Sequence, residues 1–506
     1  MADTKREIER KYEATDGTRL PGLGRVAGVG KVVARGRSEL DAVYWDTADL
    51  RLAADSLTLR RRTGGSDAGW HAKFPVAVGV RDEIHEPLSD TPPPPLAALL
   101  RSRVRHAELA PVVRLLSSRD VQHLLAEDGT LLAEVSVDTV LAERLAGEGT
   151  GTTATWTEIE VELADDGDPA FLDAVEKRLR KAGVLPATSS SKLARALAET
   201  GPGDPPTRPR EPRTAGDHVL AYVREQIRAI VALDPAVRRD LPDSVHRMRV
   251  ATRRLRSAFT TYRTVLDREA TGPLGAELKW LAAELGVDRD QEVLDDRLGA
   301  RIGALPAPLV LGPVENRLGA WSAARRTGSR RRIADVLDGE RYLALLDALD
   351  ALIADPPLRP AASRKAEKVL PKAVLKDYDR LAARIGHALD REAGPERDTA
   401  MHEARKAAKR ARYAGEAARP ALGKPAARFA RRMKAVQTVL GDHQDSVVAR
   451  EALRTLGVQA HAAGETAFTW GLLYGREEAA ADARERELPE VWVRASDPVL
   501  RADLKP

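Results

Sequence analysis

The segment EIEVEL at residues 158–163 alternates charged and apolar side chains. Such alternation predicts a β-strand, because side chains at positions i and i+2 of a strand lie on the same face. Residues 7–11, EIERK, show a related arrangement. The side chains that share a charged face are Glu158, Glu160 and Glu162 in the first segment, and Glu7, Glu9 and Lys11 in the second.

Residues 1–200 contain other short strand candidates, and we expect about eight strands in this half. The clearest are residues 7–12, 57–62, 70–74, 130–140 and 155–163. Turn-forming residues border several of them, as in GGSDAG at 64–69. Helical patterns are predicted for residues 21–36, 94–109 and 169–182.

Arg60 and Arg62 form a further charged face, of opposite sign. For any one strand, a half-exposed sheet with a solvated charged face explains the pattern. Several such strands also fit a sheet that closes with its charged faces inward. Burying unpaired charges costs several kcal/mol each, so a closed interior would need cations at its carboxylates and anions at its arginines. A tunnel that holds divalent metal and polyphosphate satisfies both.

Composition limits the remaining possibilities. The 506 residues include no cysteine, which excludes disulfides, thiolate metal sites and a cysteine nucleophile. We see no signal peptide and no apolar run of membrane length, and therefore expect a soluble cytoplasmic protein without membrane contact. Residues 1–200 carry a net charge of −5 and residues 201–506 carry +10. The segment 201–213, GPGDPPTRPREPR, predicts a stiff linker between domains at 1–200 and 214–500.

The motif order along residues 1–200 resembles that of CYTH domains, the triphosphate tunnel metalloenzymes. This resemblance implies an eight-stranded antiparallel β tunnel with flanking helices, and hence a multidomain α+β protein. It also implies metal-dependent hydrolysis of inorganic triphosphate, polyphosphate or an organic triphosphate such as thiamine triphosphate, although some members cyclise ATP. The motifs are EIERK at 7–11, YWDT at 44–47, LRRR at 59–62, WHAK at 70–73, RDE at 81–83, Arg119, EIEVE at 158–162 and SK at 191–192.

The resemblance assigns roles to individual residues. Lys73 is expected near the scissile phosphoryl group, and Tyr44 is either a catalytic assistant or a core tyrosine. Arginine suits the phosphate site because its planar guanidinium contacts two oxygens at once. The implied ligands of Mg²⁺ or Mn²⁺ are Glu7, Glu9, Asp138, Glu158 and Glu160, and the implied phosphate-binding residues are Lys11, Arg60, Arg62, Lys73, Arg81, Arg119 and Lys192.

Residues 214–500 show helical periodicity and an internal repeat. VHRMRVATRRLRSA at 245–258 aligns with MHEARKAAKRARYA at 401–414, and LAAELGVDRDQEV at 281–293 aligns with VQTVLGDHQDSVV at 436–448. The two copies, at about 214–355 and 365–500, predict two similar helical bundles. Asp290 and Asp445 are equivalent, and each would either orient a basic group or cap a helix.

Each copy carries a basic stripe. Like charges at helical spacing weaken a helix, so we expect either a solvated surface or a bound polyanion here. The histidines lack a second ligand at metal-binding spacing on the same stripe, which argues against a metal site there. The stripes are His246, Arg249, Arg253 and Arg256, with Lys279, in the first copy, and His402, Arg405, Lys409 and Arg412, with Lys434, in the second.

This half resembles the CHAD domain, an α-helical module often fused to CYTH domains. The resemblance implies non-catalytic binding of inorganic polyphosphate by these stripes, and an association with polyphosphate granules. Three alternatives stay open: a polyphosphate-binding or targeting scaffold with an idle tunnel, a nucleic-acid-binding protein and a nucleotide cyclase. Aromatic residues make up only 4% of the chain, which argues against stacking on nucleic-acid bases.

Overall fold

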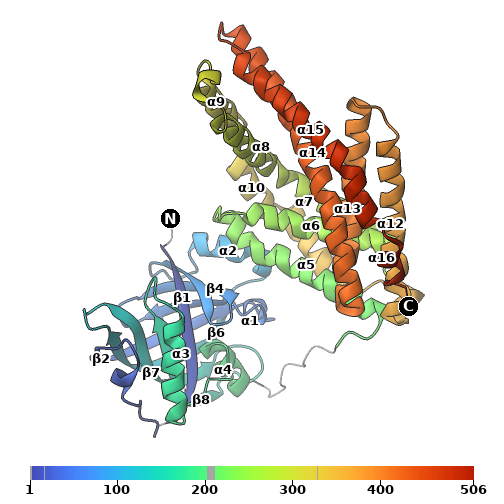
Figure 1. Cartoon of the computed structure of the whole chain (residues 1–506). Helices are drawn as coiled ribbons and strands as arrows, with labels where there is room; N and C mark the ends of the chain where they lie inside the picture. The colour runs from blue at the N-terminus through green and yellow to red at the C-terminus, as the bar shows by residue number, and fades with distance from the viewer. Residues whose placement is uncertain (1–2, 16, 202–210, 327–328, 506) are drawn as a thin grey trace. The chain divides into compact units, whose positions relative to one another are not determined.

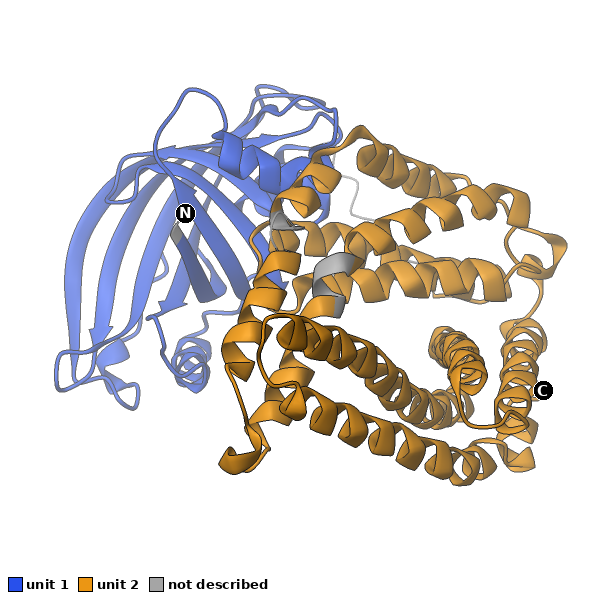
Figure 2. Cartoon of the chain, turned by 90° about the horizontal axis from the view of Figure 1, so that it is seen from above, with its two compact units in different colours: residues 1–209 blue, residues 210–506 orange. Residues whose placement is uncertain are grey.

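The computed structural model describes residues 3–15, 17–201, 211–326 and 329–505, without the side chains of 287–290, 326, 329 and 330. The chain divides into two compact units, Met1–Pro209 and Arg210–Pro506 (Figures 1 and 2). Residues 202–210 of the predicted linker lie outside the described residues. Within the described part of the chain, no helix is long and apolar enough to cross a membrane.

Eight antiparallel strands close into a barrel in the N-terminal unit, which confirms the predicted tunnel fold (Figure 2). Their order around the barrel is β1-β5-β4-β3-β2-β6-β7-β8. The sheet closes because β1 pairs with β5 through its first half and with β8 through its second half. The strands are β1 Asp3–Ala14, β2 Lys31–Asp46, β3 Thr58–Thr63, β4 Gly69–Ala77, β5 Val80–Glu86, β6 Ala110–Leu125, β7 Leu131–Arg144 and β8 Thr153–Leu163.

The apolar faces of these strands lie on the outside of the barrel, under short helices. Ile159 and Val161 of β8, for example, pack with Leu172 and Val175 of α3 (Ala170–Lys181). Similar clusters lie under α2 (Pro94–Val104) and α4 (Lys192–Thr200), and α1 (Arg51–Ala54) is a single turn. Because alternation places apolar and charged side chains on opposite faces, covering the apolar faces from outside turns the charged faces inward.

The helix predicted for residues 21–36 was wrong. This segment contains a 3₁₀ turn, Leu23–Arg25, and then the start of β2. Strand β2 pairs with β6 from Lys31 to Asp46, and this long ladder overrides the local pattern. A Cβ at Gly30 would lie 2.7 Å from the backbone of Glu127, so a side chain does not fit there. Such a close approach to the backbone of the β6–β7 turn requires glycine.

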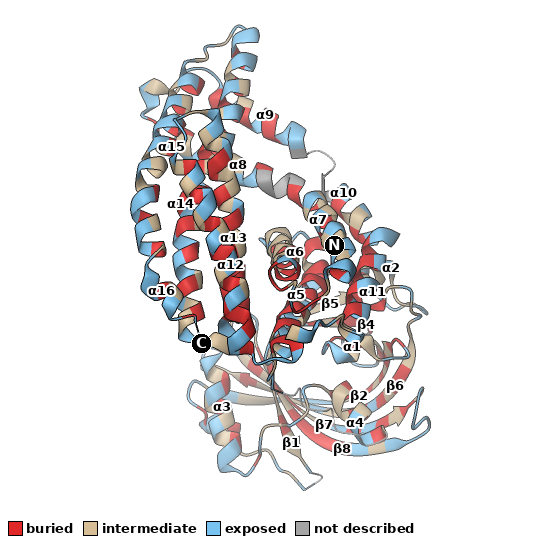
Figure 3. Cartoon of the chain, turned by 90° about the vertical axis from the view of Figure 1, so that its right-hand side faces the viewer, coloured by how far each residue is buried: buried red, intermediate tan, exposed pale blue. Residues whose placement is uncertain are grey.

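The C-terminal unit consists of helices α5 to α16 (Figure 1). The long helices of the second repeat carry buried residues along their facing sides (Figure 3). The helices are α5 Ala215–Arg238, α6 Ser244–Thr261, α7 Arg268–Glu284, α8 Gly286–Gly303, α9 Val314–Arg326, α10 Ser329–Asp338, α11 Glu340–Ala354, α12 Ala366–Leu389, α13 Pro395–Leu422, α14 Lys424–Ala462, α15 Phe468–Ala495 and α16 Pro498–Ala502.

The two repeats of the predicted duplicated helical domain share one apolar core. This core contains residues of α5, α6 and α7 together with residues of α12, α13 and α14. The Tyr262 hydroxyl, just after α6, donates a hydrogen bond of 2.9 Å to the Ala414 carbonyl of α13. In sequence order, α7 and α8 together correspond to the single helix α14. Neither repeat buries its apolar face alone, because helices of the other repeat pack against that face.

Candidate functional site

A cavity of about 1100 Å³ lies inside the barrel and is lined mainly by charged side chains. All seven predicted phosphate-binding residues line it, as do Tyr44, Glu7, Glu9 and Glu160. Asp138 and Glu158 are instead buried in the wall behind Lys192, exposing 0% and 4% of their surface. The barrel therefore brings most of the predicted residues to one cavity.

Lys192 and three carboxylates form the densest cluster of charge in this cavity. The Lys192 ammonium lies 2.9 Å from Asp138, 2.8 Å from Glu158 and 2.7 Å from Glu160. Burial opposes the charge on Lys192, but the three carboxylates raise its pKa above the usual value. Lys192 is the first residue of α4, where Ser191 caps the helix by accepting a hydrogen bond from the Ala194 amide. The helix start thus places a cation among the carboxylates of β7 and β8.

The same carboxylates fit a divalent metal ion. Oxygens of Asp138, Glu158 and Glu160 lie within 4.8 Å of one another. Their convergence on the Lys192 ammonium shows that one cation can contact all three. Carboxylate oxygens are hard ligands of the type that Mg²⁺ and Mn²⁺ prefer.

Glu7 and Glu9, the other two predicted metal ligands, contact different cations. Lys73 donates a hydrogen bond of 2.6 Å to Glu7, and Lys11 donates one of 3.0 Å to Glu9. Lys11 also contacts Glu160 and so connects Glu9 to the carboxylate triad. Burial raises the pKa of Glu7 to about 7. The five predicted ligands therefore occupy the same wall of the barrel without converging on one point.

Glu83 and His71 are cavity residues that the sequence interpretation did not assign. One oxygen of Glu83 lies 3.5 Å from the Lys73 ammonium and 2.9 Å from His71 Nδ1. Burial opposes ionisation of Glu83, but Lys73 and its other neighbours lower its pKa. Glu83 follows Arg81 by two positions on β5, and this spacing was a usable signal that both share the charged face. Lys73 is thus held between two carboxylates.

Tyr44 is a core tyrosine whose side chain also reaches the cavity. It packs in the cluster under α4, and it also lines the cavity. Burial acts to raise the pKa of the Tyr44 phenol, but the positive charge of Arg60 lowers it below the usual value. Its hydroxyl therefore lies in the positive field of Arg60, Lys192 and Lys73.

A second cavity, of about 1040 Å³, lies in the C-terminal unit between α6, α7, α12 and α13, and we call it the basic groove. Eleven Lys and Arg residues line it, against one acidic residue, Glu403. The predicted residues in its lining are Arg253, Arg256, Lys279, His402, Arg405 and Lys409. The cations that the sequence interpretation missed are Arg263, Arg268, Arg380, Arg384, Lys406 and Arg410. The sequence did not predict that α12 lines the groove, because α12 lies outside both aligned motifs.

Four predicted residues lie outside the lining of the basic groove: His246, Arg249, Arg412 and Lys434. Arg412 contacts Glu416 at 3.2 Å and stacks over the Tyr413 ring at 4.7 Å. Arg249 packs against the backbone of Gly286, where a Cβ would lie 3.1 Å from its guanidinium. The glycine of the repeated LG motif therefore makes room for an arginine.

The second copy repeats this packing. A Cβ at Gly441 would lie 3.6 Å from Nε of Arg405. Arg405 also lies 3.6 Å from Asp445, which is inside α14 rather than at its end. Asp445 therefore orients a basic group and does not cap a helix. The side chain of Asp290, its counterpart, lies outside the described residues.

Lys409 is the most perturbed cation of the basic groove. Burial, then the charges of Arg405 and Arg253, lowers the pKa of Lys409 to about 7. One of these arginines comes from each repeat, so the perturbation arises where the repeats meet. A bound anion would relieve this repulsion.

Two known domain families match this chain, one in each of its two compact units. Residues 5–197 match the CYTH domain, and residues 221–454 match the CHAD domain. The chain belongs to the family of CYTH–CHAD fusion proteins. The barrel of the CYTH unit is the tunnel that gives the triphosphate tunnel metalloenzymes their name, and the CHAD unit contains the basic groove.

Relatives extend over the full length of this CYTH–CHAD protein. Two Mycobacterium tuberculosis proteins are each 39% identical to it over 511 residues, which cover 98% of this chain and 97% of each relative. They are "Uncharacterized protein MT2285" of strain CDC 1551 / Oshkosh and "Uncharacterized protein Rv2226" of strain ATCC 25618 / H37Rv. The solved CHAD domain from the plant Ricinus communis is 25% identical and covers 58% of this chain and 92% of its own, with a TM-score of 0.40. PptA from Streptomyces chartreusis is 21% identical and covers 56% of this chain and 100% of its own, with a TM-score of 0.48.

Proposed function

We propose that the CYTH unit hydrolyses inorganic triphosphate, polyphosphate or an organic triphosphate with Mg²⁺ or Mn²⁺, and that the CHAD unit binds polyphosphate in the basic groove. The observation that carries the first part is a single cavity that is lined by ten Lys and Arg residues and has carboxylates able to hold a metal ion in its wall. Phosphoryl transfer needs little covalent help from a protein, so positioning and charge neutralisation are the main contributions such a cavity makes.

In the CYTH unit, substrate binding would exchange one set of ion pairs for another. Lys192 and Arg119 are paired with Asp138 and Glu160. A bound divalent metal would neutralise both the carboxylates and the phosphate oxygens and would activate a water molecule. With the carboxylates neutralised, Lys192 and Arg119 would be available to bind phosphate oxygens.

Lys73 has the geometry expected of a residue that stabilises charge on the transferred phosphoryl group. Its ammonium is fixed by Glu7 at 2.6 Å and by Glu83 at 3.5 Å. A cation that is already oriented stabilises developing negative charge without reorganising during the reaction. We therefore assign Lys73 to the scissile phosphoryl group and Arg60, Arg62 and Arg81 to the other phosphate oxygens.

Phosphate release tests the proposed hydrolase activity. Wild type is expected to release phosphate from at least one of triphosphate, thiamine triphosphate, ATP and long-chain polyphosphate with Mg²⁺ or Mn²⁺, and Glu7→Gln/Glu9→Gln should abolish it. The control is Arg10→Gln, because Arg10 lies between these glutamates and Lys11 in sequence but contacts Glu176 outside the barrel at 2.9 Å. No release from any of the four, with tight polyphosphate binding retained, would instead identify a non-catalytic scaffold.

Polyphosphate binding by the CHAD unit is expected to weaken as pH rises. Lys409 has a pKa of about 7 in the free groove, because burial and then Arg405 and Arg253 oppose its charge. A bound polyanion favours the charged form and raises this pKa, so binding takes up a proton. The dissociation constant should then increase as pH passes from about 6 to 8.5, by at most about tenfold per pH unit.

Calorimetry in two buffers of different ionisation enthalpy measures this proton uptake. Lys409→Arg keeps the positive charge and should remove most of the pH dependence, because arginine stays protonated. Equal proton uptake by wild type and Lys409→Arg would assign the titration to another group.

A further inference from the structure

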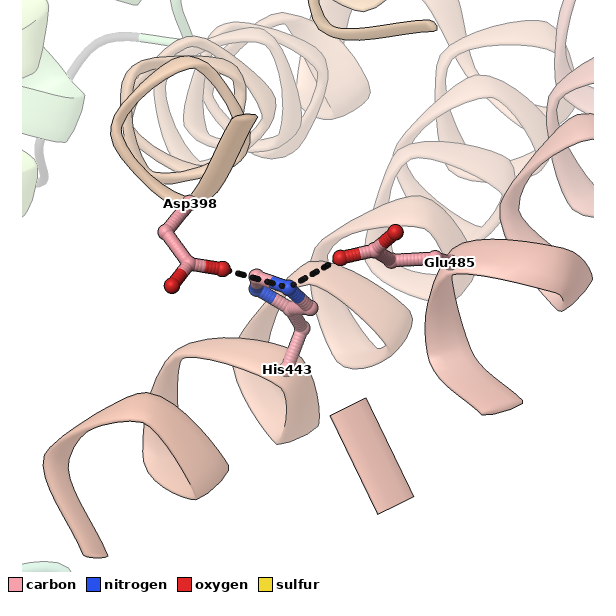
Figure 4. Close-up of side chains that lie close together, drawn as sticks. All are labelled: Asp398, His443 and Glu485. Carbon is pink, nitrogen blue, oxygen red and sulfur yellow. Dashed lines mark hydrogen bonds and ion pairs between the residues drawn. The ribbon is translucent and has the colours of Figure 1, made fainter. Parts of the chain in front are cut away.

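Three helices of the CHAD unit bring His443, Asp398 and Glu485 together (Figure 4). None of the three lines the basic groove. Asp398 lies in the first turn of α13, His443 in the middle of α14 and Glu485 on α15. His443 Nε2 lies 3.1 Å from a Glu485 oxygen and 3.3 Å from an Asp398 oxygen. The side chain of His443 exposes 0% of its surface, and those of Glu485 and Asp398 expose 10% and 20%.

The His443 ring has unusual surroundings for a buried histidine. Its Nδ1 is buried and has no hydrogen-bond partner among the described residues. Its Nε2 points between the two carboxylates, which approach from opposite helices (Figure 4). Buried polar atoms normally have hydrogen-bond partners. A completely buried imidazole with one unpartnered nitrogen and the other directed at two carboxylates is therefore not explained by packing alone.

Arginines fix the two carboxylates so that each turns one oxygen toward the ring. Arg450 contacts the other oxygen of Asp398 at 2.8 Å, and Arg397 contacts the other oxygen of Glu485 at 3.2 Å. Glu478 lies 3.9 Å from Arg450 and adds a third carboxylate to the shell. With His443 neutral, this shell carries three negative charges against two positive ones. Hydrogen-bonded outer atoms of this kind orient the ligands of metal sites.

The cluster is not part of the duplicated anion-binding pattern. By the alignment of the repeats, Asp288 takes the place of His443 and Pro242 the place of Asp398 in the first copy. Anion binding, the role predicted for both basic stripes, therefore does not explain His443 and Asp398. This pair of residues occurs in the second repeat only.

We propose that His443, Asp398 and Glu485 bind a divalent transition-metal ion of the zinc class, which links α13, α14 and α15. Metal–ligand bonds of about 2.0–2.2 Å in a tetrahedral site place ligand atoms about 3.3 Å apart, close to the 3.1 and 3.3 Å found here. The imidazole nitrogen favours zinc over Mg²⁺ and Ca²⁺, which prefer sites made only of oxygen. Three protein ligands leave a fourth position for water.

The metal would stabilise a turn of α14 that contacts two residues of the basic groove. Gln444 follows His443 on α14, and its side-chain oxygen lies 2.6 Å from Nδ1 of His402. Asp445 comes next and faces Arg405. One side of this turn of α14 therefore faces the proposed metal ligands, and the other side faces His402 and Arg405, which line the basic groove. The site fixes the helix that orients them.

Metal content of the full-length protein tests this proposal. The chain is stripped with a chelator, dialysed against Zn²⁺ and analysed for bound zinc, for wild type, His443→Gln and His461→Gln. Glutamine keeps a donor near the position of Nε2 but is a poor zinc ligand. His461 is a matched control because it lies on the same helix and is exposed. Zinc bound in the tunnel of the CYTH unit is common to all three proteins and cancels in the comparison.

We expect wild type and His461→Gln to hold one more zinc ion per chain than His443→Gln. Zinc at about 100 times its dissociation constant should also raise their Tm by roughly 5 °C relative to that variant. If His443→Gln does not fold, Asp398→Asn keeps the ring and should show the same loss. Equal zinc content and equal Tm shifts in the folded proteins would overturn the proposal and leave His443 in direct contact with the two carboxylates.

Discussion

Lys73→Met is expected to lower kcat for the best triphosphate substrate by about 10²–10³-fold, the usual effect of removing one group that stabilises transition-state charge. The contacts of Lys73 with Glu7 and Glu83 hold its ammonium in place before substrate binds. Because the charge on the transferred group develops in the transition state, KM should change much less than kcat. Steady-state kinetics of phosphate release measures both constants.

The control for this prediction is Lys177→Met, the same replacement at an exposed position on α3. It should leave kcat and KM at their wild-type values. Loss of Lys73 also leaves Glu7 and Glu83 without their shared cation, so the Tm of both variants should be compared. A higher KM at unchanged kcat would show that Lys73 binds the ground state and the transition state equally, and the assignment to the scissile group would be wrong.

Arg253→Ala/Arg405→Ala is expected to weaken polyphosphate binding by about 100-fold or more, because each charge-assisted contact contributes about 1.5–3 kcal/mol. The two arginines come from α6 and α13, one from each repeat, and both line the basic groove. The slope of log affinity against log salt should also fall by about two, because each arginine that binds a phosphate accounts for about one unit of this slope. Binding titrations at several salt concentrations give both quantities.

Arg431→Ala/Arg432→Ala removes the same charge from an exposed part of α14 outside the basic groove. This control should change affinity only slightly. Equal weakening by the two pairs would mean that polyphosphate contacts the surface at large, and that the groove has no special role. Competition with double-stranded DNA in the same assay separates a polyphosphate site from a nucleic-acid site, which salt dependence alone does not.

Several features of the fold were predictable because local spacing controls them. The alternation in EIEVEL and EIERK determines which side chains share a strand face, and the tunnel lining agrees for Glu7, Glu9, Lys11 and Glu160. The repeated His and Arg spacing likewise determines a helix face, and six of the ten predicted stripe residues line the basic groove. The helix predicted for residues 21–36 failed because long-range pairing of β2 with β6 decides that segment.

The sequence by itself therefore determined that this protein has a β domain with charged strand faces and a duplicated helical domain with basic stripes. The tertiary structure alone decided which faces meet. It placed Lys192, from the start of α4, among carboxylates of β7 and β8, and it added Arg380 and Arg384 of α12 to the basic groove. It also joined His443 to Asp398 and Glu485, which lie 45 and 42 positions away. The physical reason is that periodicity sets the direction of a side chain within its own element, whereas its partners depend on how distant elements pack.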